Sequence, residues 1–327
     1  MTTARILVQM RLIAALVALL VLAPAGAQSY ATKPVRIFVT IGPGAAADVL
    51  TRLLGEKLAV RFGQPVIIEN RAGAGGNIAA DAVAKSAPDG HTLLMASSST
   101  HGANIWVYPK LPFDPIRDFV PIILVARNPN VLVVPPSLGV STLAELLSLA
   151  RQRPGELTYA SGGTGTSMHL SGEVLASLAG IRLQHIPYKT TPEAINAALA
   201  GDVSMTFASA PTALSQVKAG KLKALGLTSE KPLASAPEIP TLASQGLAGF
   251  DVSAWYGLAA PAGTPEALIE RINAETGRVL ALPEVREKLL AIGMEPLGST
   301  PAQFGAFIRA EMQRLGEVVK ASGAKAN

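Results

Sequence analysis

The sequence predicts an α/β protein made of two similar halves followed by a helical C-terminal tail. Short runs of β-branched and apolar residues alternate with helical patterns, and glycine or proline separates them. The alternation starts again after a proline-rich stretch that ends near residue 130. At 327 residues, the chain is long enough for two domains with a core each.

The first half is expected to begin with strand 35–41 and helix 47–61. In that helix Leu50, Leu53, Leu54 and Leu58 share one face, and Gly63 ends it. Strand 65–69, helix 77–85 and strand 93–96 follow in that order. Because single helices connect these strands, we expect a mainly parallel sheet.

The second half repeats this alternation. Thr142 and Glu145 form a capping box that opens its first helix, and Thr191-Pro192-Glu193 opens a later one. The remaining expected elements are strands 131–134, 157–160, 184–186, 203–207 and 224–228 and helix 167–179.

The last third is richer in helix. Strand 255–261 precedes helices that begin at Thr264-Pro265-Glu266, at Pro283 and at the box Thr300 to Gln303. A helical tail needs a surface to pack on, and we expect it to return to the first half.

Composition and charge exclude several classes of protein. Only 16% of the residues are charged and 49% are hydrophobic, which excludes a disordered tail protein. The absence of Cys excludes disulfide scaffolds and Cys-ligated metal sites. The balance of 28 Lys plus Arg against 23 Asp plus Glu, with no basic run, argues against nucleic-acid binding.

Residues 1–27 are expected to be a secretory signal peptide cleaved after Ala27. Arg5 and Arg11 precede an apolar run from Leu12 to Ala23, and Ala25-Gly26-Ala27 forms an Ala-x-Ala site. That run is about half of what a bilayer of ~30 Å requires. The mature protein should therefore be soluble and exported.

Five donor-rich loops lie where expected strands lead into helices. They cover residues 42–48, 73–77, 97–102, 161–167 and 187–191. Glycine permits close backbone approach, and each helix N-terminus adds about half a positive charge. A single such loop is usually only a turn, but the five together indicate an anion-binding cradle assembled from both halves.

Patterns typical of catalysis or cofactor binding are absent. No G-x-S-x-G elbow occurs, which argues against an α/β-hydrolase nucleophile. The 162–167 loop lacks the lysine of the Walker motif, and its glycines do not have the spacing of the GxGxxG motif, so nucleotide binding is disfavoured. The four histidines are far apart, and we expect neither a metal ion nor a cofactor. His101 and His169 lie beside the loops as either hydrogen-bond donors or structural caps, while His91 and His185 are interpreted as ordinary turn and strand residues.

Two charged residues near the loops have alternative interpretations. The Asp48 carboxylate either favours the dipole of the first helix or fixes the preceding loop by accepting backbone N–H bonds. Lys189 is either a solvated surface charge or a long-range attraction for an anion.

Several segments together resemble the tripartite tricarboxylate transporter substrate-binding proteins, the Bug family. The most specific of these segments extends from Glu69-Asn70-Arg71 to Gly73-Ala74-Gly75-Gly76-Asn77. The other segments are residues 30–36, 43–48, 63–66, 87–90, 108–112, 129–134, 188–189 and 259–265. The likeness extends over the whole mature chain.

The resemblance implies a two-domain periplasmic binding protein, type II-like, with crossing strands near 131–134 and 254–260. Domain I would comprise 28–130 and 258–327, and domain II 131–257. The ligand of such a protein would be a small organic carboxylate, and its partners would be the membrane subunits of a tripartite transporter. We expect the protein to be a monomer. The candidate binding residues are Gly44, Ala45, Ala46, Asp48, Ser98, Ser99, Thr100, His101, Ser161, Gly163, Thr164, Gly165, Thr166, Ser167, His169, Tyr188 and Ala208.

Two departures from the family pattern bear on specificity. Ala45 replaces the second of two glycines common in the first loop, and Ala208-Ser209 stands where many members have Asp-Asn. An amino-acid ligand would need a carboxylate there for its ammonium group. Two other roles remain open: a receptor that presents its ligand to a membrane sensor, and an exported enzyme acting on the same anions.

Overall fold

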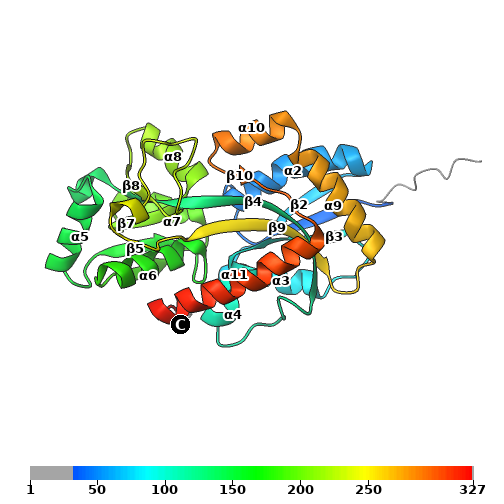
Figure 1. The fold of residues 1–327 in the computed structure, drawn as a ribbon, viewed down its shortest axis with the longest axis horizontal. Coiled ribbons are helices and arrows are strands. Elements are labelled where there is room, and N and C mark those ends of the chain that lie inside the picture. The colour runs from blue at the N-terminus through cyan, green and yellow to red at the C-terminus, as the bar shows by residue number, and fades with distance from the viewer. Residues whose placement is uncertain (1–31, 326–327) are drawn as a thin grey trace, which may run out of the picture.

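Two α/β halves lie side by side and are joined by two long strands (Figure 1). The structure, a computed structural model, describes residues 32–325. The predicted leader, residues 1–27, and its cleavage after Ala27 lie outside the described residues. Within 32–325, no helix combines the length and the apolar character that crossing a membrane would require.

The strands of both halves form one mixed sheet in the order β2-β1-β3-β9-β4-β7-β5-β6, with β8 and β10 also paired to β4. Its strands are β1 (Val35–Val39), β2 (Val66–Asn70), β3 (Thr92–Ser97), β4 (Phe119–Val134), β5 (Thr158–Ser161), β6 (Gln184–Pro187), β7 (Met205–Ser209), β8 (Lys223–Leu227), β9 (Ser253–Pro261) and β10 (Glu295–Pro296).

Helices connect these strands and cover the sheet. They are α2 (Ala46–Phe62), α3 (Asn77–Ala84), α4 (Asn104–Val107), α5 (Leu143–Gln152), α6 (Ser167–Ala179), α7 (Thr191–Ala200), α8 (Ala210–Lys218), α9 (Glu266–Leu280), α10 (Pro283–Ala291) and α11 (Pro301–Ser322). A π-helical turn, η2 (Ser99–Ala103), follows β3 directly.

The parallel pairing predicted from the sequence holds inside each half. In the first half β1 pairs in parallel with β2 and β3, and in the second half β5 pairs in parallel with β6 and β7. Every pairing that involves β4 or β9 is antiparallel. The sheet is mixed because these two strands pass from one half to the other.

Strand β4 is much longer than the strand predicted at residues 131–134. Its first part, Phe119 to Pro129, pairs with β9, and the remainder pairs with β7 and β8. Two prolines within it conceal the strand, because proline ordinarily argues against a central strand. Pro121 lies at an irregularity in the β9 pairing, and Pro129 pairs with Ser253 where β9 begins.

The helical face predicted for α2 is the one that packs on the sheet. Leu50, Leu54 and Leu58 are fully buried in a core shared with β1, β4, α9 and α10. Gly63 ends the helix with φ 66°, in the left-handed region that glycine adopts most easily. A smaller cluster with α3 residues covers the opposite face of the same sheet.

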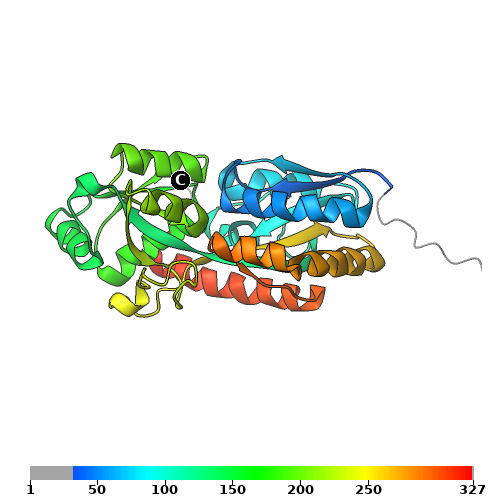
Figure 2. The same cartoon turned by 90° about the horizontal axis from the view of Figure 1, so that it is seen from above.

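Helix α11 extends from the first half toward the second (Figures 1 and 2). Near its start, Phe304 and Ile308 pack with Trp255 and belong to the first half's side of the crossing strands. Nearer its end, Leu315 and Val319 join the core cluster of the second half. The tail therefore returns to the first half, as expected, and its final turns also contact the second.

Candidate functional site

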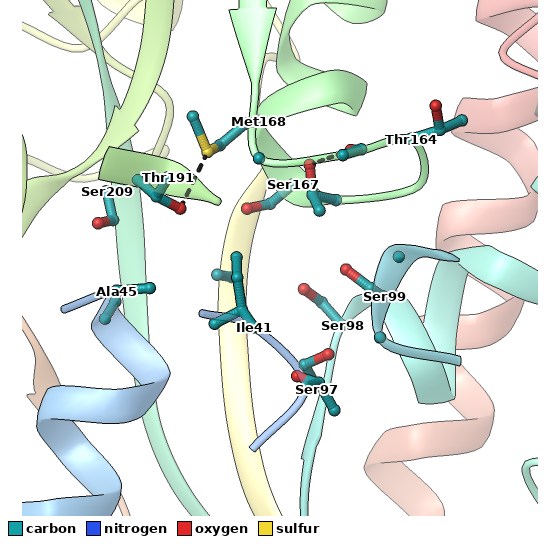
Figure 3. Close-up of a pocket in the computed structure, with 18 of the residues that line it drawn as sticks. Ile41, Ala45, Ser97, Ser98, Ser99, Thr164, Ser167, Met168, Thr191 and Ser209 are labelled. Atoms are coloured by element: carbon teal, nitrogen blue, oxygen red, sulfur yellow. Dashed lines mark hydrogen bonds between the residues drawn. The ribbon is translucent and has the colours of Figure 1, made fainter. Parts of the chain in front are cut away.

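A cavity of about 310 Å³ lies between the two halves (Figure 3). Its walls come from the carboxyl ends of β1, β3, β5 and β7 and from the loops that follow β1, β2, β3, β5 and β6, which are the five loops identified in the sequence. Side chains from the crossing strands β4 and β9 complete it. The lining residues are 40–41, 45–46, 73–76, 97–99, 108, 130, 162–164, 166–168, 187–189, 191, 209, 254 and 256.

The N-terminus of α2 faces this cavity through Ala45 and Ala46. Ala45 is the N-cap, with extended backbone (φ −76°, ψ 163°), and no side chain caps the helix. The N–H groups of the first helical turn also lack acceptors within the helix. They remain available to an anion, and the helix dipole favours negative charge at this end.

Asp48 lies behind the loop and does not line the cavity. Its carboxylate accepts from the Gly44 N–H and from Asn70 Nδ2, both at 2.9 Å, and Arg52 Nε lies 2.9 Å away. Burial raises the pKa of Asp48, but the bonds from Arg52, Gly44 and Asn70 outweigh it and leave the pKa below its ordinary value. Asp48 therefore fixes the loop, and Gly44 is part of that arrangement rather than of the lining.

The end of β3 provides hydroxyl groups on one side of the cavity. Ser98 and Ser99 line it, and Figure 3 shows their hydroxyls directed into the open space. Neither hydroxyl is hydrogen-bonded to another described residue, whereas Ser97 bonds with Thr100. Ser98 and Ser99 thus have free donors at this wall.

Two other predicted residues of this loop turn into the protein. Thr100 Oγ1 accepts from the Ser97 N–H (3.2 Å) and lies 3.1 Å from His101 Nδ1. His101 is fully buried with its ring edge-to-face on Phe119, 4.7 Å between centroids, and burial lowers its pKa to about 3. The π-helical turn directs both side chains away from the cavity, a feature that residue spacing alone does not reveal.

The loop after β5 supplies the facing wall. Gly163, Thr164, Thr166 and Ser167 line the cavity, the last two at the N-terminus of α6. The Thr166 hydroxyl caps that helix and donates to the Gly163 carbonyl (2.7 Å). Ser167 Oγ accepts from Asn130 Nδ2 (3.1 Å), which leaves its own proton free to donate into the cavity.

The remaining predicted residues of this loop support it and are not part of the cavity lining. Ser161, Gly165 and His169 do not line the cavity, and Ser161 is fully buried. The Gly165 N–H donates to His169 Nδ1 (3.2 Å), and the Ser161 hydroxyl donates to the Gly163 carbonyl (3.1 Å). These contacts hold the loop in place through residues that do not themselves line the cavity.

Of the two remaining predicted residues, Tyr188 lies at the cavity and Ala208 does not. Tyr188 lines the cavity together with its neighbour Lys189. Ala208 is fully buried in strand β7, where it pairs with Val131, and Ser209 reaches the lining instead. The strand runs to Ser209, two residues beyond the predicted end at residue 207, and this shift accounts for the difference.

The cavity lining combines polar and apolar side chains and contains almost no charged ones. Among residues 32–325, no acidic side chain lines the cavity, and the one basic side chain is that of Lys189, which is exposed. Ile41, Met168 and Tyr256 provide apolar surface. In the same part of the chain, no group of three or more His, Asp or Glu side chains is arranged to hold a metal ion.

Sequence reasoning missed several lining residues. The lining also includes Thr191, Ser209, Tyr256 and Lys189, which are not among the candidate binding residues. Thr191 opens the helix after the predicted loop 187–191, so the same strand-end argument could have found it. Tyr256 lies on a crossing strand, and nothing in its neighbourhood distinguishes it.

The two halves touch beside the cavity. A Cβ atom placed on Gly42, in the first half, would collide with the side chain of Thr190 in the second half. Contact between the loops that face one another means that the structure describes the halves drawn together around the cavity.

Comparison with known proteins identifies the family. Residues 50–324 match the family described as "Tripartite tricarboxylate transporter family receptor". The chain is 37% identical over 304 residues to Protein BugT of Bordetella pertussis, covering 93% of each chain.

Two solved structures have the same fold. Rpa4515 of R. palustris with adipate has a TM-score of 0.87 and 34% identity, covering 89% of this chain and 98% of the other. MatC (Rpa3494) of Rhodopseudomonas palustris with bound malate has a TM-score of 0.84 and 32% identity, covering 88% and 99%. These relatives are solute-binding receptors rather than enzymes, and their fold is the α/β periplasmic binding protein fold that the sequence predicted. This chain belongs to the tripartite tricarboxylate transporter receptor family.

Proposed function

We propose that this chain is an exported receptor that binds a small organic carboxylate in the cavity and delivers it to the membrane subunits of a tripartite-type transporter. The observation that carries the proposal is the composition of the cavity wall. Helix N-termini and free hydroxyls from both halves surround it, and no acidic side chain of the described residues lines it.

These donors are strong enough to hold a desolvated carboxylate. Hydrogen bonds to a charged acceptor contribute roughly 1.5 to 3 kcal/mol each. A helix N-terminus adds about 0.3 to 1 kcal/mol when exposed and more when partly buried. Ser98, Ser99 and Ser167 together with the first turns of α2 and α6 can offset the cost of removing the carboxylate from water.

The ligand we propose has no ammonium group. The carboxylate of Asp48, in the first turn of α2, is engaged by Gly44, Asn70 and Arg52 and does not line the cavity. A buried ammonium without a partner would cost several kcal/mol. Apolar surface at Ile41, Met168 and Tyr256 suits a ligand with a hydrocarbon body, and the adipate and malate bound by similar receptors support the carboxylate class.

Capture would proceed by closure of two domains about the crossing strands β4 and β9. We assign residues 28–130 and 258–327 to one domain and 131–257 to the other. Because the walls of the cavity come from both domains, a ligand makes its full set of contacts only when they are together. It therefore shifts the population toward the closed state.

We also propose that the mature protein is located in the periplasm, because residues 1–27 have the pattern of a secretory signal peptide. Cleavage after Ala27 would release a protein that begins at Gln28. N-terminal sequencing of the exported protein tests the site, and a membrane-bound product that retains residues 1–27 would contradict it.

A thermal-shift screen of carboxylic acids against amino acids tests the ligand class. A ligand that binds only the folded protein raises its melting temperature. We expect mono- or dicarboxylates without an amine, such as adipate and malate, to give the largest shifts. A larger shift with aspartate or glutamate would show that the ammonium group finds a partner and that the assigned class is wrong.

A further inference from the structure

Two histidines stack behind the loop that connects β5 to α6. His169 lies in the first turn of α6 and His185 on β6, with ring centroids 4.1 Å apart and an angle of 24° between the rings. His169 is buried and His185 partly buried, and neither lines the cavity. The pair contacts the loop at Ser161 and Gly165, two residues that do not line the cavity.

His169 holds the loop at Gly165. The Gly165 N–H donates to His169 Nδ1 at 3.2 Å, so this nitrogen must be unprotonated. The ring proton is then on Nε2, which lies 3.8 Å from Glu173 Oε1. Gly165 has φ 83°, so this bond fixes an amide in a backbone conformation that few residues adopt.

His185 holds the loop at Gly163 through Ser161. The Ser161 hydroxyl donates to the Gly163 carbonyl (3.1 Å) and accepts from the Gly163 N–H (3.2 Å). His185 Nε2 lies 2.6 Å from the same oxygen. Because the Ser161 proton is used by the carbonyl, His185 Nε2 carries a proton and donates it to Ser161.

The two histidines thus fix the segment that forms one wall of the cavity. Gly163 and Thr164 line the cavity between the two supported positions, and Thr166 and Ser167 follow directly. A shift of this segment would move the Thr166 and Ser167 hydroxyls and the N-terminus of α6 relative to the donors on the other wall.

We propose that His169 and His185 are positioning residues, which as neutral imidazoles hold loop 161–167 in the geometry that binds the ligand. The role of this wall in ligand binding rests on the proposed function, whereas the support of the loop does not.

The surroundings of the pair favour the neutral rings. Burial lowers the pKa of His169 to about 4, and burial together with the neighbouring His169 lowers the pKa of His185 to about 3. Glu173 is the acidic group that faces His169, and the Tyr159 hydroxyl of β5 donates to Glu173 Oε1 (2.5 Å). The Tyr159 ring stacks on His185 at 4.9 Å. The loop support should therefore persist at neutral and mildly acidic pH.

The first experiment measures the loop without any ligand. Amide hydrogen exchange of loop 161–167 is compared by mass spectrometry in the wild type, His169→Ala and His185→Ala, with β1 as the internal control. We expect exchange to accelerate in the loop while β1 stays unchanged. Wild-type exchange of the loop in both variants would overturn the proposal.

A crossed pair of substitutions separates positioning from packing. The carboxamide of Asn reaches the place of Nδ1 and that of Gln the place of Nε2. His169→Asn should therefore restore slow exchange and His169→Gln should not, whereas His185→Gln should restore it and His185→Asn should not. Equal behaviour of Asn and Gln at both positions would show that only ring packing matters and would overturn the proposal.

Calorimetric titration with adipate extends the test to binding. His169→Ala should bind about 3- to 10-fold more weakly than the wild type, the range expected for one lost hydrogen bond, and His169→Asn should recover most of the loss. Wild-type affinity in His169→Ala would contradict the positioning role. If the wild type itself binds no acid, the proposed function fails, and the exchange pattern still decides whether the pair supports the loop.

Discussion

The Tyr108 hydroxyl of the first half donates a hydrogen bond to the backbone carbonyl of Thr164 in the second half, at 3.1 Å. Both residues line the cavity, so the bond closes one side of it. Burial raises the pKa of Tyr108, which keeps the hydroxyl protonated and able to donate. The bond can exist only while the two halves are together.

Replacing Tyr108 by Phe removes this bond and leaves the ring in place. A typical hydrogen bond contributes about 0.5 to 1.5 kcal/mol, so affinity for the ligand should fall roughly 2- to 10-fold. Calorimetric titration measures the loss, and the melting temperature of the ligand-free protein serves as the control. Unchanged affinity would mean that the bond does not contribute to closure.

Gly165→Ala should weaken binding more than it weakens folding. A Cβ atom there would collide with Asn104 Oδ1 across the gap between the halves, and overpacking of this kind costs about 1 to 3 kcal/mol. Gly155 offers a matched control, since it has the same φ of 83° and no atom within 4 Å of an added Cβ. Calorimetric titration compares the ligand affinities of Gly165→Ala and Gly155→Ala. Equal affinities would show that backbone strain alone, and not the collision with Asn104, is involved.

Ser98→Ala and Ser167→Ala remove one hydroxyl donor from each wall of the cavity. Each hydrogen bond to a carboxylate contributes roughly 1.5 to 3 kcal/mol, so each variant should lose about 10- to 150-fold in affinity. Ser137→Ala, at an exposed position away from the cavity, should bind like the wild type. A loss in only one of the two cavity variants would indicate that the ligand contacts one half alone.

The protein should lose stability as the pH falls below about 6.5. Burial lowers the pKa of His101 to about 3, of His169 to about 4 and, with His169 nearby, of His185 to about 3, from an ordinary value of 6.5. In this window the unfolded chain binds more protons than the folded one, so stability is complete above pH 6.5 and is lost toward pH 4. Each histidine contributes at most about 1.4 kcal/mol per pH unit.

Melting temperatures measured between about pH 7.5 and pH 5 check this dependence. His101→Leu removes one buried imidazole that lies outside the cavity wall, so its melting temperature should fall less steeply with acid than that of the wild type. Identical slopes would mean that His101 does not bind extra protons on unfolding.

Local sequence signals predicted most of the secondary structure. Helix α6 begins at Ser167 and ends at Ala179 as expected, and capping boxes at Thr142 and Thr300 open α5 and α11. Such boundaries depend on residues within a few positions of one another, so they can be found in the sequence. Strand β4 was recognised only at its end, because Pro121 and Pro129 are tolerated at a bulge and at a change of pairing partner.

The candidate site was predicted at the level of loops and only partly at the level of side chains. Of the candidate binding residues, Ser98 and Ser167 line the cavity, whereas His101 and Ala208 do not. Which way a side chain points depends on the π-helical turn after β3 and on the register of β7, and neither has a recognisable pattern. Contacts between the halves, such as Tyr108 with Thr164, depend on the three-dimensional arrangement alone.

We propose that the cavity between the halves binds one small organic carboxylate and leaves it unchanged. The most direct measurement is a calorimetric titration with the acid that gives the largest thermal shift, followed by NMR of the recovered acid. We predict one equivalent bound per chain, an acid recovered intact, and a large loss of affinity in the Ser98→Ala/Ser167→Ala double variant. Conversion of the acid would contradict a binding role, and wild-type affinity in the double variant would contradict binding in this cavity.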